Sequence, residues 1–328
     1  MREHYLAWYD QIFSQLKVME ELEIASLSKM PRSIIISGMG GSGIVGDLYQ
    51  TVTSDRLNIP VVVIKDYKLP KWVSSKDLAV AVSYSGNTLE TIECFKHALK
   101  VNAKLLAISS GGVLEKLALE NNILYVKVVK GLVPRASLPS MFTALAISLN
   151  KLLNSEIVTR DELNEAMKLL KQGVKDDFVI KIADHIENTL PVIVTCVKYA
   201  PLAIRFKNEL NENSKIPAKV EVVPEWGHND IVGWEKPYFK NFSVVILREP
   251  MGGDTKCSAI LDYVDKYFKN SGIRTINIEM KGKSITAQIL YGSLLAGLVS
   301  IELAYRRNID PVKTMSIVEY KKYFTTIF

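Results

Sequence analysis

Two short apolar runs, each ending in a turn rich in glycine and serine, constrain the fold of this chain most. The first run leads into GMGGSG at Gly38–Gly43 and the second into SYSGNT at Ser83–Thr88. A helix-like stretch follows each turn, so the N–H groups at the helix start face whatever lies beyond the strand end. Two such turns in one domain predict an α/β fold that binds a phosphorylated ligand.

Apolar runs alternate with helical patterns along the whole chain, which predicts parallel sheets covered by helices. The predicted strands of the first half form a five-stranded doubly wound sheet and are Ser33–Ser37, Val61–Ile64, Leu78–Val82, Lys104–Ile108 and Ile123–Val128. The predicted helices are Thr88–Asn102, Val113–Asn121 and Ser140–Leu153. Because ligands bind beyond the carboxyl ends of parallel strands, we expect both turns at one edge of the sheet.

The pattern restarts after a charged, helix-favouring stretch, Thr159–Asn188. The later strands are predicted at Pro191–Cys196, Lys219–Val223, Phe242–Leu247 and Thr275–Glu279, and the helices at Tyr199–Lys215, Ser258–Asn270, Ile285–Arg307 and Pro311–Phe324. The similar order of the two halves suggests an internal duplication. The expected division is an N-terminal helical segment (1–30), a first parallel-sheet domain (31–153), a helical bridge (154–188) and a second parallel-sheet domain with a C-terminal helix (189–328).

Composition excludes several classes of protein. The 328 residues are 48% hydrophobic and 23% charged, as in soluble globular proteins, and the net charge of +6 suits an anionic small molecule. Basic residues do not cluster into a nucleic-acid-binding patch, and no apolar run approaches the roughly 18 residues of a membrane helix. The start of the chain lacks the apolar core of a signal peptide, so a cytoplasmic location is expected.

The three cysteines, Cys94, Cys196 and Cys257, are scattered and lack CxxC spacing. This pattern indicates neither a disulfide framework nor a zinc site, and it predicts three small buried apolar residues.

Other interpretations of the glycine-rich turns remain open from the residues alone. Each turn by itself is also typical of ordinary turn and cap residues. Gly38, Gly40 and Gly43 spell GxGxxG, and Asp66 follows the next apolar run near the spacing of a ribose-binding acid, which would indicate a dinucleotide site. That alternative leaves SYSGNT unexplained.

Three segments of the chain carry side chains suited to proton transfer and charge stabilisation. His228 lies in an irregular, tryptophan-flanked segment, and imidazole is a side chain suited to general acid–base chemistry; the alternative is a loop histidine packed on tryptophan. Glu209 and Glu212 are adjacent on one helical face, so one could point inward while the other meets solvent. Arg135 lies in a proline-marked loop at the predicted carboxyl edge, where a guanidinium could meet an oxyanion.

Taken together, these motifs resemble the sugar isomerase (SIS) superfamily and, within it, the archaeal-type bifunctional phosphoglucose/phosphomannose isomerases. The resemblance covers nearly the whole chain and rests on GMGGSG, SYSGNT, PRAS (Pro134–Ser137), NENSKIPA (Asn211–Ala218) and PEWGHN (Pro224–Asn229). It implies two SIS domains of flavodoxin-like fold. It also implies an aldose–ketose isomerase that interconverts glucose 6-phosphate and mannose 6-phosphate with fructose 6-phosphate.

Carried over by position, the resemblance implies a set of substrate-binding residues. It places phosphate binding on Ser42, Ser83, Ser85 and Thr88, with Gly40 and Gly41 giving the sugar room. Thr314 corresponds to a position near C1 and C2 of the sugar that is associated with acceptance of mannose.

The resemblance also implies the catalytic roles. Glu212 would be the base that moves a proton between C1 and C2 through a cis-enediolate, and Arg135 would stabilise its charge. His228 would help to open the sugar ring from the neighbouring subunit of a homodimer. A lysine of the last helix would assist; IVEYKK indicates Lys321, with Lys313 and Lys322 as alternatives.

No cofactor and no metal are expected, because this chemistry needs a base, an oxyanion partner and a ring-opening group. No set of His, Asp and Glu at ligand spacing indicates a metal-dependent isomerase. The alternative function is a noncatalytic SIS protein that binds sugar phosphate, as in regulators joined to a DNA-binding helix-turn-helix. The first 30 residues are too short and not basic enough for that module.

Overall fold

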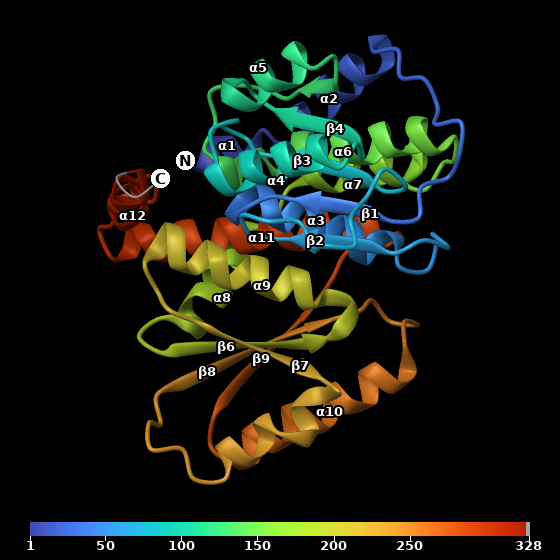
Figure 1. Cartoon of the computed structure of the whole chain (residues 1–328). Coiled ribbons are helices and arrows are strands. Elements are labelled where there is room, and N and C mark those ends of the chain that lie inside the picture. Colours follow the sequence, from blue (N-terminus) through green and yellow to red (C-terminus); the bar gives the residue numbers. More distant parts are fainter. Residues whose placement is uncertain (326–328) are drawn as a thin grey trace. The chain divides into compact units, whose positions relative to one another are not determined.

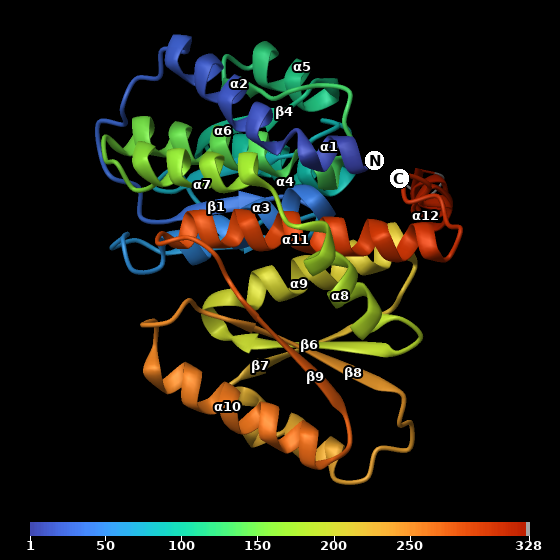
Figure 2. The same ribbon diagram turned by 180° about the vertical axis from the view of Figure 1, so that it is seen from behind.

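The computed structural model describes residues 1–325, which divide into two compact units (Figure 1). The N-terminal unit comprises Glu3–Gly173 and Lys281–Tyr291, and the C-terminal unit comprises Met1–Arg2, Val174–Met280 and the chain from Gly292 onward. Each unit contains one parallel sheet with helices on both faces, seen from the opposite side in Figure 2. The predicted fold class is therefore confirmed.

The sheet of the N-terminal unit has five parallel strands in the order β2-β1-β3-β4-β5. The strands are β1 (Ile34–Ser37), β2 (Val61–Ile64), β3 (Leu78–Val82), β4 (Lys104–Ser109) and β5 (Leu124–Lys127). Central strands β1 and β3 are buried at every position, as expected for apolar runs covered on both faces, whereas β2 at the edge is partly exposed. All five strands match the predicted runs.

Helices cover both faces of this sheet. They are α1 (Arg2–Leu6, of which Arg2 falls in the other unit), α2 (Trp8–Glu21), α3 (Gly40–Thr53), α4 (Leu89–Lys100), α5 (Gly112–Glu120), α6 (Leu138–Leu153) and α7 (Arg160–Gln172). Gly46 lets α3 approach Ile36 of β1 closely, whereas the neighbouring Ile35 packs against α4 on the opposite face. Successive strand residues therefore face α3 and α4 alternately.

The sheet of the C-terminal unit has four parallel strands in the order β7-β6-β8-β9. The strands are β6 (Leu190–Cys196), β7 (Lys219–Val223), β8 (Phe242–Arg248) and β9 (Arg274–Glu279). The helices are α8 (Asp176–Ile186), α9 (Ala200–Glu209), α10 (Thr255–Asn270), α11 (Ile285–Arg306, whose first turns to Tyr291 fall in the other unit) and α12 (Met315–Thr325). Helix α10 covers one face, and α8 and α9 cover the other (Figures 1 and 2). The order repeats that of β2-β1-β3-β4, so the two sheets share one topology over four strands.

Three predicted helical stretches differ from the observed helices. The charged stretch Thr159–Asn188 forms two helices, α7 and α8, because the chain turns at Gly173 with φ of +69°. Helix α9 ends at Glu209 and continues as one π-helical turn, Leu210–Ser214. Helix α12 begins at Met315 rather than at Pro311.

Helix α11 corrects the expectation that no segment is long and apolar enough to cross a membrane. It passes that test by length and composition, with a mean hydropathy of 1.5, and it is the only helix in residues 1–325 that does. The structure buries 94% of its apolar window inside the protein, as in a core helix.

The prediction of three unpaired cysteines is wrong. Cys196, at the end of β6, and Cys257, in the first turn of α10, form a disulfide with a Cα–Cα distance of 6.2 Å. The two residues are 61 positions apart, so only the crossover between β6 and α10 brings them together. Cys94 is free and buried, as predicted, and burial raises the pKa of its thiol to about 12.

Removing the Cys196–Cys257 disulfide is expected to lower the free energy of unfolding by about 2–4 kcal/mol, because the bond restricts a long loop in the unfolded chain. Denaturant unfolding with and without reductant measures this, and the Cys196→Ser/Cys257→Ser variant, insensitive to reductant, is the control. Thiol titration of the unreduced, denatured protein should find Cys94 alone. Three reactive thiols would contradict the pairing.

Candidate active site

The two serine-rich turns meet at the point where the winding of the N-terminal sheet reverses. GMGGSG follows β1 and SYSGNT follows β3, and these strands are neighbours in the sheet. Because α3 and α4 leave towards opposite faces, the turns enclose the crevice in which open α/β sheets bind their ligands. The prediction that both turns lie at one carboxyl edge is confirmed.

The start of α3 is open to an anion. Its N-cap residue, Met39, has no side chain that can cap the helix, so the first amides are left for another acceptor. Gly40 has a φ of +52°, a conformation that favours glycine. A Cβ on Gly41 would stand 3.0 Å from the backbone N of Arg135, so only glycine allows α3 to begin this close to the Arg135 turn.

Ser42 links the two turns directly. Its Oγ accepts a hydrogen bond of 2.9 Å from the backbone N–H of Tyr84, and its hydroxyl proton faces the Sδ atom of Met141 at 3.7 Å. A thioether is a weak acceptor, so this proton can be redirected to a stronger one such as a phosphate oxygen.

The hydroxyls of the second turn form a short directed chain. Ser83 is buried and donates to Thr88 Oγ1 at 3.0 Å, which leaves the Thr88 proton for a further acceptor. Thr88 is the N-cap residue of α4 but makes no side-chain capping bond, so its hydroxyl and the α4 amides lie side by side. Ser85 is exposed, and its Oγ accepts from the Asn87 amide at 3.2 Å.

A third turn, Ser109–Gly112 after β4, braces SYSGNT and was missed by the sequence prediction. A Cβ on Gly86 would stand 1.7 Å from the Gly111 carbonyl oxygen, so these two turns touch through glycine backbone. Asn87 Oδ1 accepts from the Val113 amide at 3.0 Å and so occupies the start of α5. The signal was present as SSGG directly after the Lys104–Ile108 run.

Arg135 lies beside these turns, on the short 3-10 turn Pro134–Ser137, and is 5% exposed. Helix α2 holds this turn in place: Trp8 Nε1 and Gln11 Nε2 both donate to the carbonyl of Ala136, at 3.0 and 2.9 Å. The N-terminal unit therefore brings together seven of the predicted site residues: Gly40, Gly41, Ser42, Ser83, Ser85, Thr88 and Arg135.

A second group of predicted residues lines a pocket of about 530 Å³ within the C-terminal unit. Glu212 and Thr314 both line it, together with Lys215 and Lys313. The ammonium of Lys215 donates to the carbonyls of Glu212 at 2.8 Å and of Asp310 at 3.1 Å. Lys215 thus ties the turn that carries Glu212 to the segment that leads to Thr314.

The turn that carries Glu212 is a π-helical turn, a geometry that is rare and frequent at functional sites. Below it, Glu209 is 1% exposed and forms an ion pair with Arg205, which is equally buried. Asn213 Nδ2 bridges Glu209 Oε2 at 2.7 Å and Ser300 Oγ at 2.9 Å. Glu209 therefore points inward and Glu212 meets the pocket, as their spacing predicted.

His228 lies on an exposed 3-10 turn, Glu225–His228, and does not line the pocket of Glu212. Its segment is anchored by Glu221, a buried carboxylate that accepts from Trp234 Nε1 at 2.9 Å and pairs with Lys219. Burial raises the pKa of Glu221, although the Lys219 ammonium opposes this. The anchor leaves His228 presented to solvent on the single chain.

The three candidate lysines occupy different places. Lys321 and Lys322 are exposed on α12 and do not line the pocket. Lys313 does line it and lies 3.7 Å from the Asp310 carboxylate.

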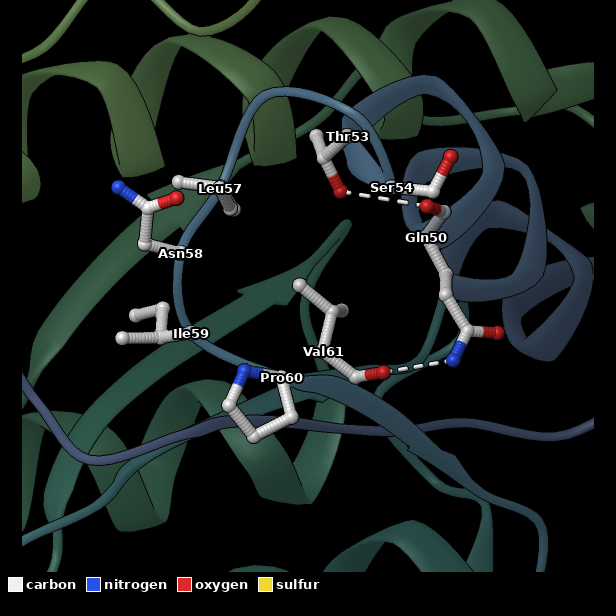
Figure 3. Close-up of a pocket in the computed structure, with 8 residues that line it drawn as sticks. All are labelled: Gln50, Thr53, Ser54, Leu57, Asn58, Ile59, Pro60 and Val61. Carbon is white, nitrogen blue, oxygen red and sulfur yellow. Dashed lines mark hydrogen bonds between the residues drawn. The ribbon is translucent and has the colours of Figure 1, made fainter.

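A hollow of about 380 Å³ in the N-terminal unit lies away from all these residues (Figure 3). It is enclosed by the connection from α3 to β2, at the amino end of β2, and none of its lining residues has a titratable side chain. Gln50 spans it by donating to the Val61 carbonyl at 2.6 Å (Figure 3). It offers no groups for chemistry.

The corresponding crevice of the C-terminal sheet, between β6 and β8, is closed by the protein itself. The Cys196–Cys257 disulfide crosses it, and Asp254 caps α10 by accepting from the amides of Lys256 and Cys257 at 2.8 and 3.3 Å. Two amides of the first turn of α10 are therefore occupied by a side chain of the protein itself. In residues 1–325, no three His, Cys, Asp or Glu side chains gather in a way that would hold a metal ion.

Comparison with known proteins matches both units to families. Residues 27–147 match the model of the SIS domain, and residues 177–324 match that of the bacterial phospho-glucose isomerase C-terminal SIS domain. Seven relatives, 29–35% identical, are named bifunctional phosphoglucose/phosphomannose isomerase; the one from Aquifex aeolicus is 35% identical over 89% of this chain and 90% of its own.

A relative with a different name is the D-glucosamine-6-phosphate 4-epimerase of Sulfolobus acidocaldarius, 31% identical over 86% of this chain and 85% of its own. Among solved structures, the C-terminal domain of glucosamine-fructose-6-phosphate aminotransferase from Francisella tularensis is similar in fold. Its TM-score is 0.72 at 17% identity, covering 95% of this chain and all of that chain.

Proposed function

Because the chain belongs to the family of bifunctional phosphoglucose/phosphomannose isomerases, we propose that it interconverts glucose 6-phosphate and mannose 6-phosphate with fructose 6-phosphate. The reaction is an intramolecular oxidation and reduction of adjacent carbons. The observation that carries the proposal is the crevice between β1 and β3, where hydroxyls and free helix amides converge beside Arg135.

We assign the phosphate to Ser42, Ser83, Ser85 and Thr88. The redirectable protons of Ser42 and Thr88 support this, because each can turn from its present weak or absent acceptor to a phosphate oxygen. The first amides of α3 and α4 add partial positive charge. Gly40 leaves open space beside the α3 start for the sugar, and Gly41 lets the Arg135 turn lie close to it.

We assign the base to Glu212. Its carboxylate takes the proton from C2 of the open-chain aldose, and the electron pair moves towards the C1 carbonyl to form a cis-enediolate. The negative charge on oxygen is stabilised by the Arg135 guanidinium. The proton returns to C1, while a hydroxyl proton passes from O2 to O1, which completes the ketose. No atom is gained or lost.

The remaining roles are ring opening, recognition of the sugar carbons and assistance by a lysine. We propose that His228 assists opening of the sugar ring from a second copy of the chain in a homodimer, which its exposure on the single chain permits. Thr314, in the pocket with Glu212, would contact C1 and C2 and allow both aldose epimers. Lys321 would assist, although Lys313 is the candidate that shares the pocket with Glu212. A cytoplasmic location would suit such a metabolic enzyme.

A coupled assay of the purified protein with EDTA tests the proposal. Both glucose 6-phosphate and mannose 6-phosphate should yield fructose 6-phosphate at undiminished rate with the chelator present. Binding of fructose 6-phosphate without any turnover would instead favour the noncatalytic alternative. Glucosamine 6-phosphate serves as a further substrate, since conversion of it alone would favour the chemistry named for the Sulfolobus acidocaldarius relative.

Gly41→Ala is expected to lower kcat/KM about tenfold or more, because its Cβ would force the α3 start and the Arg135 turn apart. Steady-state kinetics with fructose 6-phosphate measure the effect. Gly233→Ala is the matched control, since a Cβ there meets no atom within 4 Å. Wild-type kcat/KM in Gly41→Ala would show that the close approach is not needed.

A further inference from the structure

Tyr84, the second residue of SYSGNT, has no assigned role, yet it bonds to the turns after β1 and β4 and to the segment that precedes the Arg135 turn. Its side chain is buried, with 6% exposed, between the two serines that are assigned to phosphate. The hydrogen bonds of its backbone and of its hydroxyl reach three other segments of the unit. It therefore differs from the serines, whose hydroxyls face the crevice.

The backbone of Tyr84 joins three turns. Its N–H donates to Ser42 Oγ at 2.9 Å, which holds the turn after β1. Its carbonyl accepts from both the amide and the hydroxyl of Ser110, at 2.9 and 2.7 Å, which holds the turn after β4. Since both carbonyl lone pairs are used, the orientation of this peptide unit is well defined.

The side chain of Tyr84 reaches the segment that leads to Arg135. Its phenol oxygen accepts a hydrogen bond of 2.7 Å from the backbone N–H of Leu132, three residues before Arg135. Among the described residues, Leu132 has the one amide of Val129–Val133 that is hydrogen-bonded to the rest of the unit, and Gly131 has a φ of +92°. This connection between β5 and the Arg135 turn thus has one hydrogen-bonded anchor.

The protonation state suits this anchor. Burial raises the pKa of Tyr84 above its ordinary value, and the Leu132 amide offsets part of that shift. The phenol therefore stays neutral in the pH range in which a sugar phosphate isomerase is assayed.

We propose that Tyr84 is a positioning residue that sets the Arg135 turn relative to the hydroxyls of Ser42, Ser83 and Thr88. Because its backbone is part of the phosphate turn and its hydroxyl holds the arginine segment, it fixes the distance between the bound phosphate and the charge-stabilising guanidinium. The proposal rests on the function proposed above, in which Arg135 stabilises the enediolate.

Tyr84→Phe tests the proposal, because it removes the hydroxyl while keeping the ring and all backbone contacts. We expect kcat to fall about tenfold, with KM for fructose 6-phosphate changed by less than about twofold. The Leu132 amide should exchange its hydrogen faster. Tyr49→Phe is the matched control, since the Tyr49 hydroxyl is buried without a partner among the described residues, and its kcat should stay at the wild-type value.

A double-mutant cycle separates positioning from general stability. If the hydroxyl acts through Arg135, then Tyr84→Phe should have no further effect on kcat in an Arg135→Ala background. Additive losses, an unchanged kcat in Tyr84→Phe, or unchanged exchange of the Leu132 amide would each overturn the proposal. An inactive wild-type protein would instead overturn the proposed function, so the two failures are distinct.

Discussion

Glu212→Gln is expected to lower kcat by about 10²–10⁴-fold, because general acid–base catalysis contributes that much and the amide cannot carry the proton between C1 and C2. The KM for fructose 6-phosphate should change little, since we assign phosphate binding to the hydroxyls of the N-terminal unit. The measurement is the steady-state rate of fructose 6-phosphate conversion, with binding followed by calorimetry.

The contacts that hold the turn at Glu212 are expected to persist in the Glu212→Gln variant. The turn that carries Glu212 is fixed from below by Asn213 and by the buried Arg205–Glu209 pair, none of which involves the Glu212 side chain in these contacts. Glu235→Gln is the control, since Glu235 is exposed and lies outside the pocket. Undiminished turnover in Glu212→Gln would remove Glu212 as the base.

Arg135→Ala should lower kcat by about 10²–10³-fold, the usual effect of removing one group that stabilises an oxyanion. The kcat of Arg135→Lys should lie between that of Arg135→Ala and that of the wild type, because an ammonium keeps the charge but not the planar fork of the guanidinium. The rates with glucose 6-phosphate and with mannose 6-phosphate should fall together, since both pass through the same enediolate.

Arg135 is 5% exposed, so its removal also changes packing, and melting temperatures must accompany the kinetics. A variant that melts near the wild-type temperature and turns over substrate slowly would match the account. One that keeps the wild-type kcat would exclude Arg135 from charge stabilisation.

The strands were predictable because their apolar runs are short, β-branched and separated by helical patterns. β1 and β3 are buried on both faces, so their sequences carry no polar interruption that would blur their limits. The position of the two serine-rich turns followed from a general rule of parallel sheets, which needs only the strand order around β1 and β3.

The features that sequence reasoning missed depend on contacts between distant segments. Cys196 and Cys257 pair only because β6 and α10 are brought together, and no local spacing signals it. The π-helical turn at Leu210–Ser214 has an ordinary helical sequence, and its Asn213 contacts Ser300 of α11, 87 residues away. Tyr84 stayed unassigned because its partners Ser110 and Leu132 lie 26 and 48 residues away.

The central claim is that the chain moves a proton between C1 and C2 of a sugar phosphate through an enediolate. Incubation of fructose 6-phosphate with the protein in deuterium oxide and EDTA, followed by NMR of the products, tests it most directly. The account predicts glucose 6-phosphate and mannose 6-phosphate, with deuterium at C2 in at least part of each. The absence of both aldoses, or their formation without any deuterium at C2, would contradict it.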